Sequence, residues 1–184
     1  GQDNTCGGRF NQQYGELPFG YDHKYVYSHF GYNLKATDLQ AAIGCAQVEK
    51  LPGFIMERQN NWKYLRNSLE YLCNKLILPE ATERSEPSWF GFAITAKNNN
   101  IRNRIMKHLE SNRIQTRMLF AGNIIKQPCF NALRSSSKYY RIVRSLKNTN
   151  KIMNDTLWFG VYPGIRKMQM DWIMQVLNEI MNKY

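Results

Sequence analysis

The chain has 184 residues, and 43 % of them are hydrophobic, which excludes a largely disordered protein and allows one domain with an appended arm. The formal net charge of +11 favours acidic partners such as nucleic acid or phosphorylated small molecules, although it is equally typical of a surface charged for solubility. Because we find no secretory signal and no apolar run of membrane-spanning length, we expect a cytoplasmic protein with no membrane partner.

Residues 1–36 predict an extended arm without regular structure. Glycines recur through this stretch and interrupt any helical or strand period, and tyrosines and phenylalanines fill the intervals between them. Aromatic side chains at this density are rarely left in water, so we expect the arm to pack against another surface. The chain begins with Gly1 in the middle of this loop-like stretch, and we expect it to be part of a longer protein.

A helix is predicted to begin after Thr37, which suits an N-cap because Gln40 follows three residues later as the partner in a capping box. Pro52 has no N–H to donate, so this helix should stop or bend there. Apolar residues at helical spacing then predict a second helix over residues 55–74.

The rest of the chain alternates strand and helix patterns. Short aromatic and β-branched runs predict strands, and apolar residues three or four positions apart predict amphipathic helices. The predicted elements are a strand at 86–97, a helix at 100–114, a strand at 114–120, a loop with a helical turn at 121–133, a helix at 148–157 capped by Asn148 or Thr149, a strand at 157–164 and a helix at 167–184. This order predicts an α+β fold with a small, mostly antiparallel sheet and helices on one face. We therefore divide the chain into the arm at 1–36 and a domain at 37–184.

Standard catalytic and nucleic-acid motifs are absent from the sequence. It contains no nucleophile elbow, P-loop or metalloprotease helix, and its Lys and Arg residues are scattered singly outside any known nucleic-acid motif. Nucleic acid is therefore a disfavoured partner, and a basic module for RNA or an acidic protein is only an alternative. Cys45 and Cys73 fall on apolar helix faces, which favours buried thiols, and His108 is expected to be solvated.

Asn33 stands in an aromatic-rich loop just before the predicted helix start. The exposed N–H groups of a helix N-terminus attract phosphate, but Asp38 in the first turn competes with a bound dianion. The Asn33 amide can instead donate to a phosphate held by another surface. The alternative is that Asn33 holds a left-handed turn.

The stretch GYNLKATDLQAAIG, residues 31–44, resembles a motif of the DegT/DnrJ/EryC1/StrS sugar aminotransferase and dehydratase family. The segments DNTCGGRF, LPFGYDHKYVYSH, LPEATERSEPSWFGF and TRMLFAGNIIKQP are similar to its CDP-4-keto-6-deoxyglucose 3-dehydrase branch. The similarity runs from residue 3 to residue 184, in order and in spacing. It implies the small C-terminal domain of the fold-type-I, aspartate aminotransferase-like fold, preceded by the end of the large cofactor domain.

The resemblance also implies the activity, which is that of a lyase. A dehydratase of this branch removes the C3 hydroxyl of nucleotide-linked 4-keto-6-deoxyhexoses in deoxysugar, lipopolysaccharide and O-antigen biosynthesis. Its cofactors are pyridoxamine or pyridoxal 5'-phosphate and a 2Fe-2S cluster, and its partners are a second copy in a homodimer and an NADH-dependent flavin/iron–sulfur reductase. The catalytic His or Lys would precede Gly1, so we expect no catalytic residue in this chain and no activity from it alone. An ordinary sugar aminotransferase of the same fold is the alternative.

Four residues are candidates for binding roles. Asn33 matches the family asparagine that reaches the cofactor phosphate of the neighbouring subunit, and Cys6 matches the last of the four iron–sulfur ligands. Arg117, expected at a strand end, has a planar guanidinium that suits a substrate phosphate, although it could equally be an interface or surface residue. Lys35 is a second candidate for binding substrate.

Overall fold

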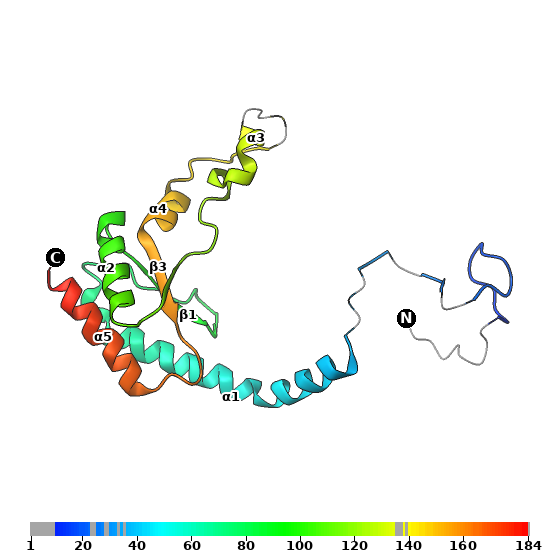
Figure 1. The fold of residues 1–184 in the computed structure, drawn as a ribbon, viewed down its shortest axis with the longest axis horizontal. Helices are drawn as coiled ribbons and strands as arrows, with labels where there is room; N and C mark the ends of the chain where they lie inside the picture. The colour runs from blue at the N-terminus through cyan, green and yellow to red at the C-terminus, as the bar shows by residue number, and fades with distance from the viewer. Residues whose placement is uncertain are drawn as a thin grey trace. The chain divides into compact units, whose positions relative to one another are not determined.

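The computed structural model describes residues 10–22, 25–27, 30–32, 34, 36–134, 138 and 140–183. The chain divides into two compact units, Gly1–Cys45 and Ala46–Tyr184. The elements, labelled in Figure 1, are α1 (Asp38–Ser68), η3 (Glu70–Leu72), β1 (Gly91–Thr95), α2 (Asn99–Ser111), β2 (Thr116–Met118), η4 (Ile124–Lys126), η5 (Pro128–Phe130), α3 (Asn131–Arg134), α4 (Lys147–Asp155), β3 (Thr156–Gly160) and α5 (Lys167–Met181).

The first unit contains turns, and no strand or α-helix occurs among its described residues before Asp38. Gln13 closes one turn, because its Nε2 donates to the carbonyl oxygens of Gly15 at 2.8 Å and Leu17 at 2.5 Å. Aromatic rings further along are exposed, and those of Phe30 and Tyr32 have almost no protein cover. Whether the arm packs against another surface stays a prediction.

Helix α1 begins as predicted. The Thr37 N–H donates to Gln40 Oε1 at 2.9 Å and the Gln40 N–H donates to Thr37 Oγ1 at 3.3 Å, which is the expected capping box. The helix then continues through Pro52, so the prediction of two separate helices is wrong. Proline costs about 3 kcal/mol inside a helix, but the carbonyl it deprives of a donor belongs to the exposed Val48, where water can replace the lost hydrogen bond.

The second unit contains a three-stranded sheet in the order β1-β3-β2, and both pairs of strands are antiparallel. This confirms the predicted α+β arrangement with a small antiparallel sheet. Each strand is shorter than predicted; β1 and β2 lie inside their predicted ranges, whereas β3 begins one residue earlier, at Thr156. Among the described residues β2 is the shortest strand and pairs with β3 alone.

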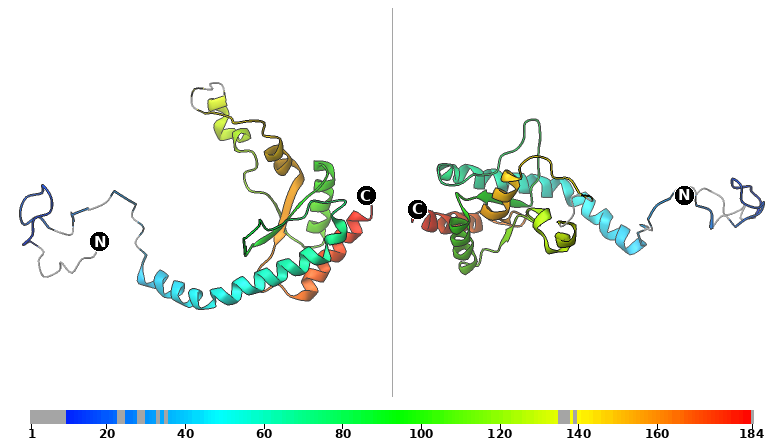
Figure 2. Two further views of the ribbon diagram at one scale, coloured as in Figure 1. Left: turned by 180° about the vertical axis from the view of Figure 1, so that it is seen from behind. Right: turned by 90° about the horizontal axis from the view of Figure 1, so that it is seen from above.

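One face of the sheet carries the hydrophobic core, and α2 and α5 lie side by side against it (Figures 1 and 2). Phe92 and Phe159 are paired across β1 and β3, are almost fully buried, and stack with their ring centroids 5.5 Å apart. The end of α1 contributes Leu65 to the same core, and Leu69 and Leu72 follow just after the helix. Cys45 and Cys73 lie outside it and are exposed, so the prediction of buried thiols is wrong: Leu72 takes the inward position beside Cys73.

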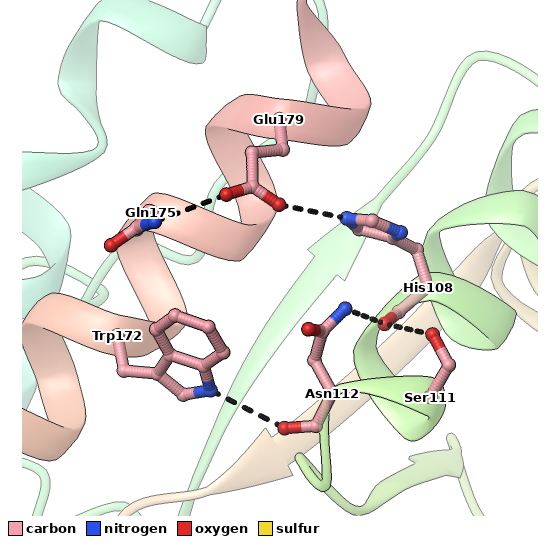
Figure 3. Close-up of polar contacts among 6 residues, drawn as sticks. All are labelled: His108, Ser111, Asn112, Trp172, Gln175 and Glu179. Atoms are coloured by element: carbon pink, nitrogen blue, oxygen red, sulfur yellow. Dashed lines mark hydrogen bonds and ion pairs between the residues drawn. The ribbon is translucent and has the colours of Figure 1, made fainter.

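Polar contacts join α2 to α5, as Figure 3 shows. Trp172 Nε1 donates to the carbonyl oxygen of Asn112 at 3.3 Å, and His108 Nε2 lies 3.4 Å from Glu179 Oε2. Because the His108 side chain is only 24 % exposed, the prediction of a solvated histidine is wrong.

The segment between β2 and β3 contains the short helices η4, η5 and α3 and then α4. In Figures 1 and 2, α3 and α4 extend away from the end of the sheet that lies opposite α1. Helix α4 begins after Leu146 with no side-chain cap, so the predicted caps Asn148 and Thr149 lie inside the helix instead.

Candidate functional site

Of the four residues to which the sequence assigns a binding role, Arg117 lies in the described part of the chain. Cys6, Asn33 and Lys35 lie outside the described residues, so their predicted roles stay predictions. Arg117 is the middle residue of β2 rather than a residue at the strand end, and it is exposed. The candidate site therefore centres on Arg117.

Strand pairing fixes the direction of Arg117. It lies opposite Trp158 of β3, while its neighbours Thr116 and Met118 lie opposite the core residues of that strand. Directly paired residues project from the same face of a sheet, so Arg117 and Trp158 share the face that α2 and α5 do not cover. The Arg117 side chain makes no hydrogen bond or ion pair with the residues that the structure describes. Its guanidinium is available to a ligand.

Glu110 holds the start of β2 in place. Its Oε1 accepts hydrogen bonds from the Thr116 N–H at 2.6 Å and from Thr116 Oγ1 at 2.7 Å. These hydrogen bonds lower the pKa of the Glu110 carboxyl, because they stabilise its charged form. The last turn of α2 thus positions the strand that carries Arg117.

An aromatic cluster of Phe90, Phe120 and Trp158 lies beside Arg117. The ring centroids of Phe90 and Trp158 are 5.2 Å apart in an edge-to-face arrangement, and Phe120 lies 6.3 Å from Phe90 and 6.2 Å from Trp158. Trp158 Nε1 donates to the Met118 carbonyl oxygen at 3.1 Å, which holds the indole over β2. Phe90 and Phe120 nevertheless remain 52 % and 73 % exposed.

The loop that presents Phe120 is constrained. Phe120 has φ +45°, in the left-handed region that few residues other than glycine adopt. Gly122 has φ +62°, and a Cβ there would lie 2.5 Å from Met153 Cγ of α4. Asn123 is 2 % exposed, and its Nδ2 donates to Asn150 Oδ1 at 2.9 Å. Two contacts with α4 therefore hold the exposed Phe120 in an unfavourable backbone conformation.

Two cavities adjoin the aromatic cluster. The larger is a groove of about 1170 Å³, lined by residues that include Arg113, Gln115, Arg117, Tyr162 and Trp172. The smaller is an apolar cleft of about 290 Å³, lined by residues that include Pro79, Trp89, Ala93 and Phe120. Phe90 and Trp158 line both cavities and so lie between them.

The groove carries an excess of available positive charge. Its carboxylate, Asp171, is engaged by Lys167 Nζ at 2.8 Å and by the Tyr64 hydroxyl. These two hydrogen bonds lower the pKa of Asp171, with that from Lys167 contributing more. Arg113 and Arg117, by contrast, have no carboxylate partner among the described residues.

Sequence reasoning identified Arg117 but missed the aromatic cluster and Glu110. Strand alternation within LWFG could have indicated that Trp158 projects away from the buried Phe159. The same rule would place Phe90 on the face of the buried Phe92, and Phe90 escapes it because it lies just before β1 begins at Gly91. No comparable signal exists for Glu110, because its contact with Thr116 depends on the turn that separates α2 from β2.

The described residues do not form the predicted cofactor sites by themselves. They contain no group of three or more His, Cys, Asp or Glu side chains that could hold a metal ion, and their cysteines Cys45, Cys73 and Cys129 are free and exposed. The sheet they form is small and antiparallel. Among the same residues, no helix is long and apolar enough to cross a bilayer.

In a comparison with known proteins, residues 12–178 match the DegT/DnrJ/EryC1/StrS aminotransferase family. The lipopolysaccharide biosynthesis protein RfbH of Salmonella typhimurium is 51 % identical over 97 % of this chain and 40 % of its own length. The dTDP-4-dehydro-2,6-dideoxy-D-glucose 3-dehydratase of Saccharopolyspora spinosa is 46 % identical over 100 % of this chain and 39 % of its own length. The chain thus spans about two fifths of the length of these relatives.

A solved structure shares the fold. The Escherichia coli GDP-4-keto-6-deoxy-D-mannose-3-dehydratase with bound hydrated PLP superposes with a TM-score of 0.72 at 26 % identity, over 84 % of this chain and 38 % of that one. The small antiparallel sheet and its helices match the C-terminal part of the fold-type-I, aminotransferase-like dehydratases. This confirms the predicted fold class.

Proposed function

The chain belongs to the DegT/DnrJ/EryC1/StrS aminotransferase family, and from this membership we propose that it is the C-terminal part of a nucleotide-deoxysugar 3-dehydratase. One observation carries the proposal: the identities of 51 % and 46 % to RfbH and to a dTDP-sugar 3-dehydratase extend over nearly all of this chain. The cofactor is pyridoxamine or pyridoxal 5'-phosphate, as the PLP bound to the Escherichia coli dehydratase suggests.

The substrate is a nucleotide-linked 4-keto-6-deoxyhexose, and the enzyme acts in the cytoplasm in lipopolysaccharide or other deoxysugar biosynthesis. When bound, the cofactor supplies the electron sink for removal of the C3 hydroxyl. This chain supplies binding and orientation rather than catalytic groups. The exposed, unpaired Arg117 binds the substrate diphosphate, for which a planar guanidinium is suited, and Lys35 is a second substrate contact.

The arm at 1–36 belongs to the end of the cofactor domain, and the helices and sheet of 37–184 follow it. Its Asn33 donates to the cofactor phosphate of the other subunit in a homodimer. The aromatic residues of the arm support this proposal, since Tyr27, Phe30 and Tyr32 are highly exposed and would be covered by the second subunit.

The proposal includes a 2Fe-2S cluster. It rests on the resemblance of Cys6 to an iron–sulfur ligand, and the other three thiolates would have to come from outside this chain. An NADH-dependent flavin/iron–sulfur reductase would then supply the electrons for the 3-deoxy product. Iron and sulfide analysis of the whole protein, before and after Cys6→Ser, tests this element separately.

A sugar aminotransferase of the same fold is the second candidate, because the family as a whole is described as aminotransferases. The two reactions leave different products, since transamination places nitrogen at C4 and dehydration removes oxygen from C3. The test incubates the whole protein with cofactor, reductant and a nucleotide-linked 4-keto-6-deoxyhexose, with and without glutamate, and identifies the sugar by NMR. A 3-deoxy sugar supports the proposal, and a 4-amino sugar with an intact C3 hydroxyl supports the aminotransferase.

A further inference from the structure

The two cavities beside the aromatic cluster differ in chemistry. The smaller cleft offers aromatic and aliphatic walls, with Trp89 and Phe120 among them, and its carboxylate Glu80 is paired with Arg66 at 3.2 Å. The larger groove offers the unpaired guanidinium groups of Arg113 and Arg117. Phe90 and Trp158 lie between the two, so a ligand that crosses them would meet an apolar region and then a basic one.

A nucleoside diphosphate has the same two parts in the same order. Its base is a flat aromatic surface that stacks on aromatic side chains, and its phosphates bind arginine through charge-assisted hydrogen bonds. The apolar cleft, at about 290 Å³, lies near the lower limit of small-ligand pockets, which suits a single base rather than a whole nucleotide sugar.

The backbone at Phe120 supports a ligand contact. The residue is 73 % exposed, so it contributes little to the core, yet it is held at φ +45° by a loop fastened to α4 through Asn123 and Gly122. Backbone strain of this kind persists where the surrounding structure enforces it, and it concentrates at ligand-binding sites. An exposed ring in an enforced conformation is what a stacking contact requires.

We infer that Phe120, Phe90 and Trp158 bind the nucleobase of the substrate, and that Arg117 and Arg113 bind its diphosphate. The inference rests on the proposed function, because it takes the nucleotide-linked sugar as the ligand. It adds that the C-terminal domain recognises the nucleotide and leaves the sugar to be held elsewhere.

The test uses the whole protein and measures dissociation constants by calorimetry for CDP, dTDP, GDP and inorganic pyrophosphate. Phe120→Ala should weaken binding of the nucleoside diphosphates about 5- to 150-fold and leave pyrophosphate binding unchanged. Phe120→Tyr, which keeps the ring, should bind them like the parent. Arg117→Gln should weaken binding of both classes of ligand.

Matched controls are available on the same domain. Tyr71→Ala removes another exposed ring, and Lys107→Gln removes another exposed positive charge, both outside the two cavities. Neither control should alter any of the four dissociation constants.

Nucleotide dissociation constants unaffected by Phe120→Ala would overturn the inference. If that variant also melted at a lower temperature, Phe120 would be a packing residue covered by the rest of the polypeptide rather than a ligand contact. The proposed function fails differently, through a sugar product that keeps its C3 hydroxyl, whatever the nucleotide affinities are.

Discussion

The contact between Asn123 and Asn150 offers a sharp test of how the Phe120 loop is held. Asn123→Ala removes a hydrogen bond of 2.9 Å from a site where Asn123 is 2 % exposed. A neutral hydrogen bond contributes about 0.5–1.5 kcal/mol, and the partner left unsatisfied adds a desolvation penalty. Because Asn150 is half-buried and water can reach it in part, we expect a total loss of about 1–2 kcal/mol.

This loss should appear in the loop rather than in the whole domain. The N–H groups of Phe120, Gly122 and Lys126 donate to backbone carbonyls within the segment, so their hydrogen exchange reports its local opening. A loss of 1–2 kcal/mol should accelerate exchange of these amides about 5- to 30-fold. Exchange of the strand amides of β1 and β3 should be unaffected.

A double-mutant cycle separates the contact from other effects of the substitution. Asn150→Ala should accelerate hydrogen exchange of the same amides. In the double variant these amides should exchange only slightly faster than in either single variant, because both substitutions remove the same interaction. Asn100→Ala, an exposed asparagine of α2, is the matched control and should leave the loop unchanged. Fully additive effects, or unchanged exchange in Asn123→Ala, would refute the reasoning.

Three further predictions concern the core, the acid range and the cofactor. Phe92→Ala removes a fully buried ring and should lower the free energy of unfolding of the sheet domain by about 3–5 kcal/mol in urea, and an unchanged midpoint would contradict the core assignment. Hydrogen bonds from Lys167 and Tyr64 lower the folded-state pKa of Asp171 below its ordinary 3.8. Ionised Asp171 therefore stabilises the folded state above pH 3.8, and this stabilisation is lost as the pH falls through the folded-state pKa. Asp171→Asn should flatten the dependence of the melting temperature on pH below about pH 4. A pH profile identical to that of the parent would contradict this prediction. In the whole enzyme, Asn33→Ala should weaken cofactor retention about 10- to 150-fold, since a hydrogen bond to a charged group contributes about 1.5–3 kcal/mol, and an equal dissociation constant would remove the phosphate role.

Local sequence signals predicted those elements whose determinants lie close together in the chain. The Thr37 capping box depends on residues three apart, and the amphipathic pattern of α2 and α5 depends on spacing within one helix. Both were confirmed, as was the small antiparallel sheet. The family was identified from several short segments that occur in order, and the match over residues 12–178 confirms it.

Features that depend on tertiary contacts were missed or mispredicted. Local rules place a helix end or a bend at Pro52, but one helix continues through it. The carbonyl that loses its donor belongs to the exposed Val48, so water can replace the missing hydrogen bond. His108 has surface neighbours in sequence, yet α5 brings Glu179 against it. The aromatic cluster joins residues 90, 120 and 158, which only strand pairing and the loop after β2 bring together.

The fate of the C3 oxygen tests the central claim most directly. The measurement supplies the whole protein, with cofactor and reductant, with a nucleotide-linked 4-keto-6-deoxyhexose that carries ¹⁸O in its C3 hydroxyl, and follows the label by mass spectrometry. A 3-dehydratase releases the label into water and leaves a sugar without it. A sugar product that retains the label, with or without nitrogen at C4, would contradict the account.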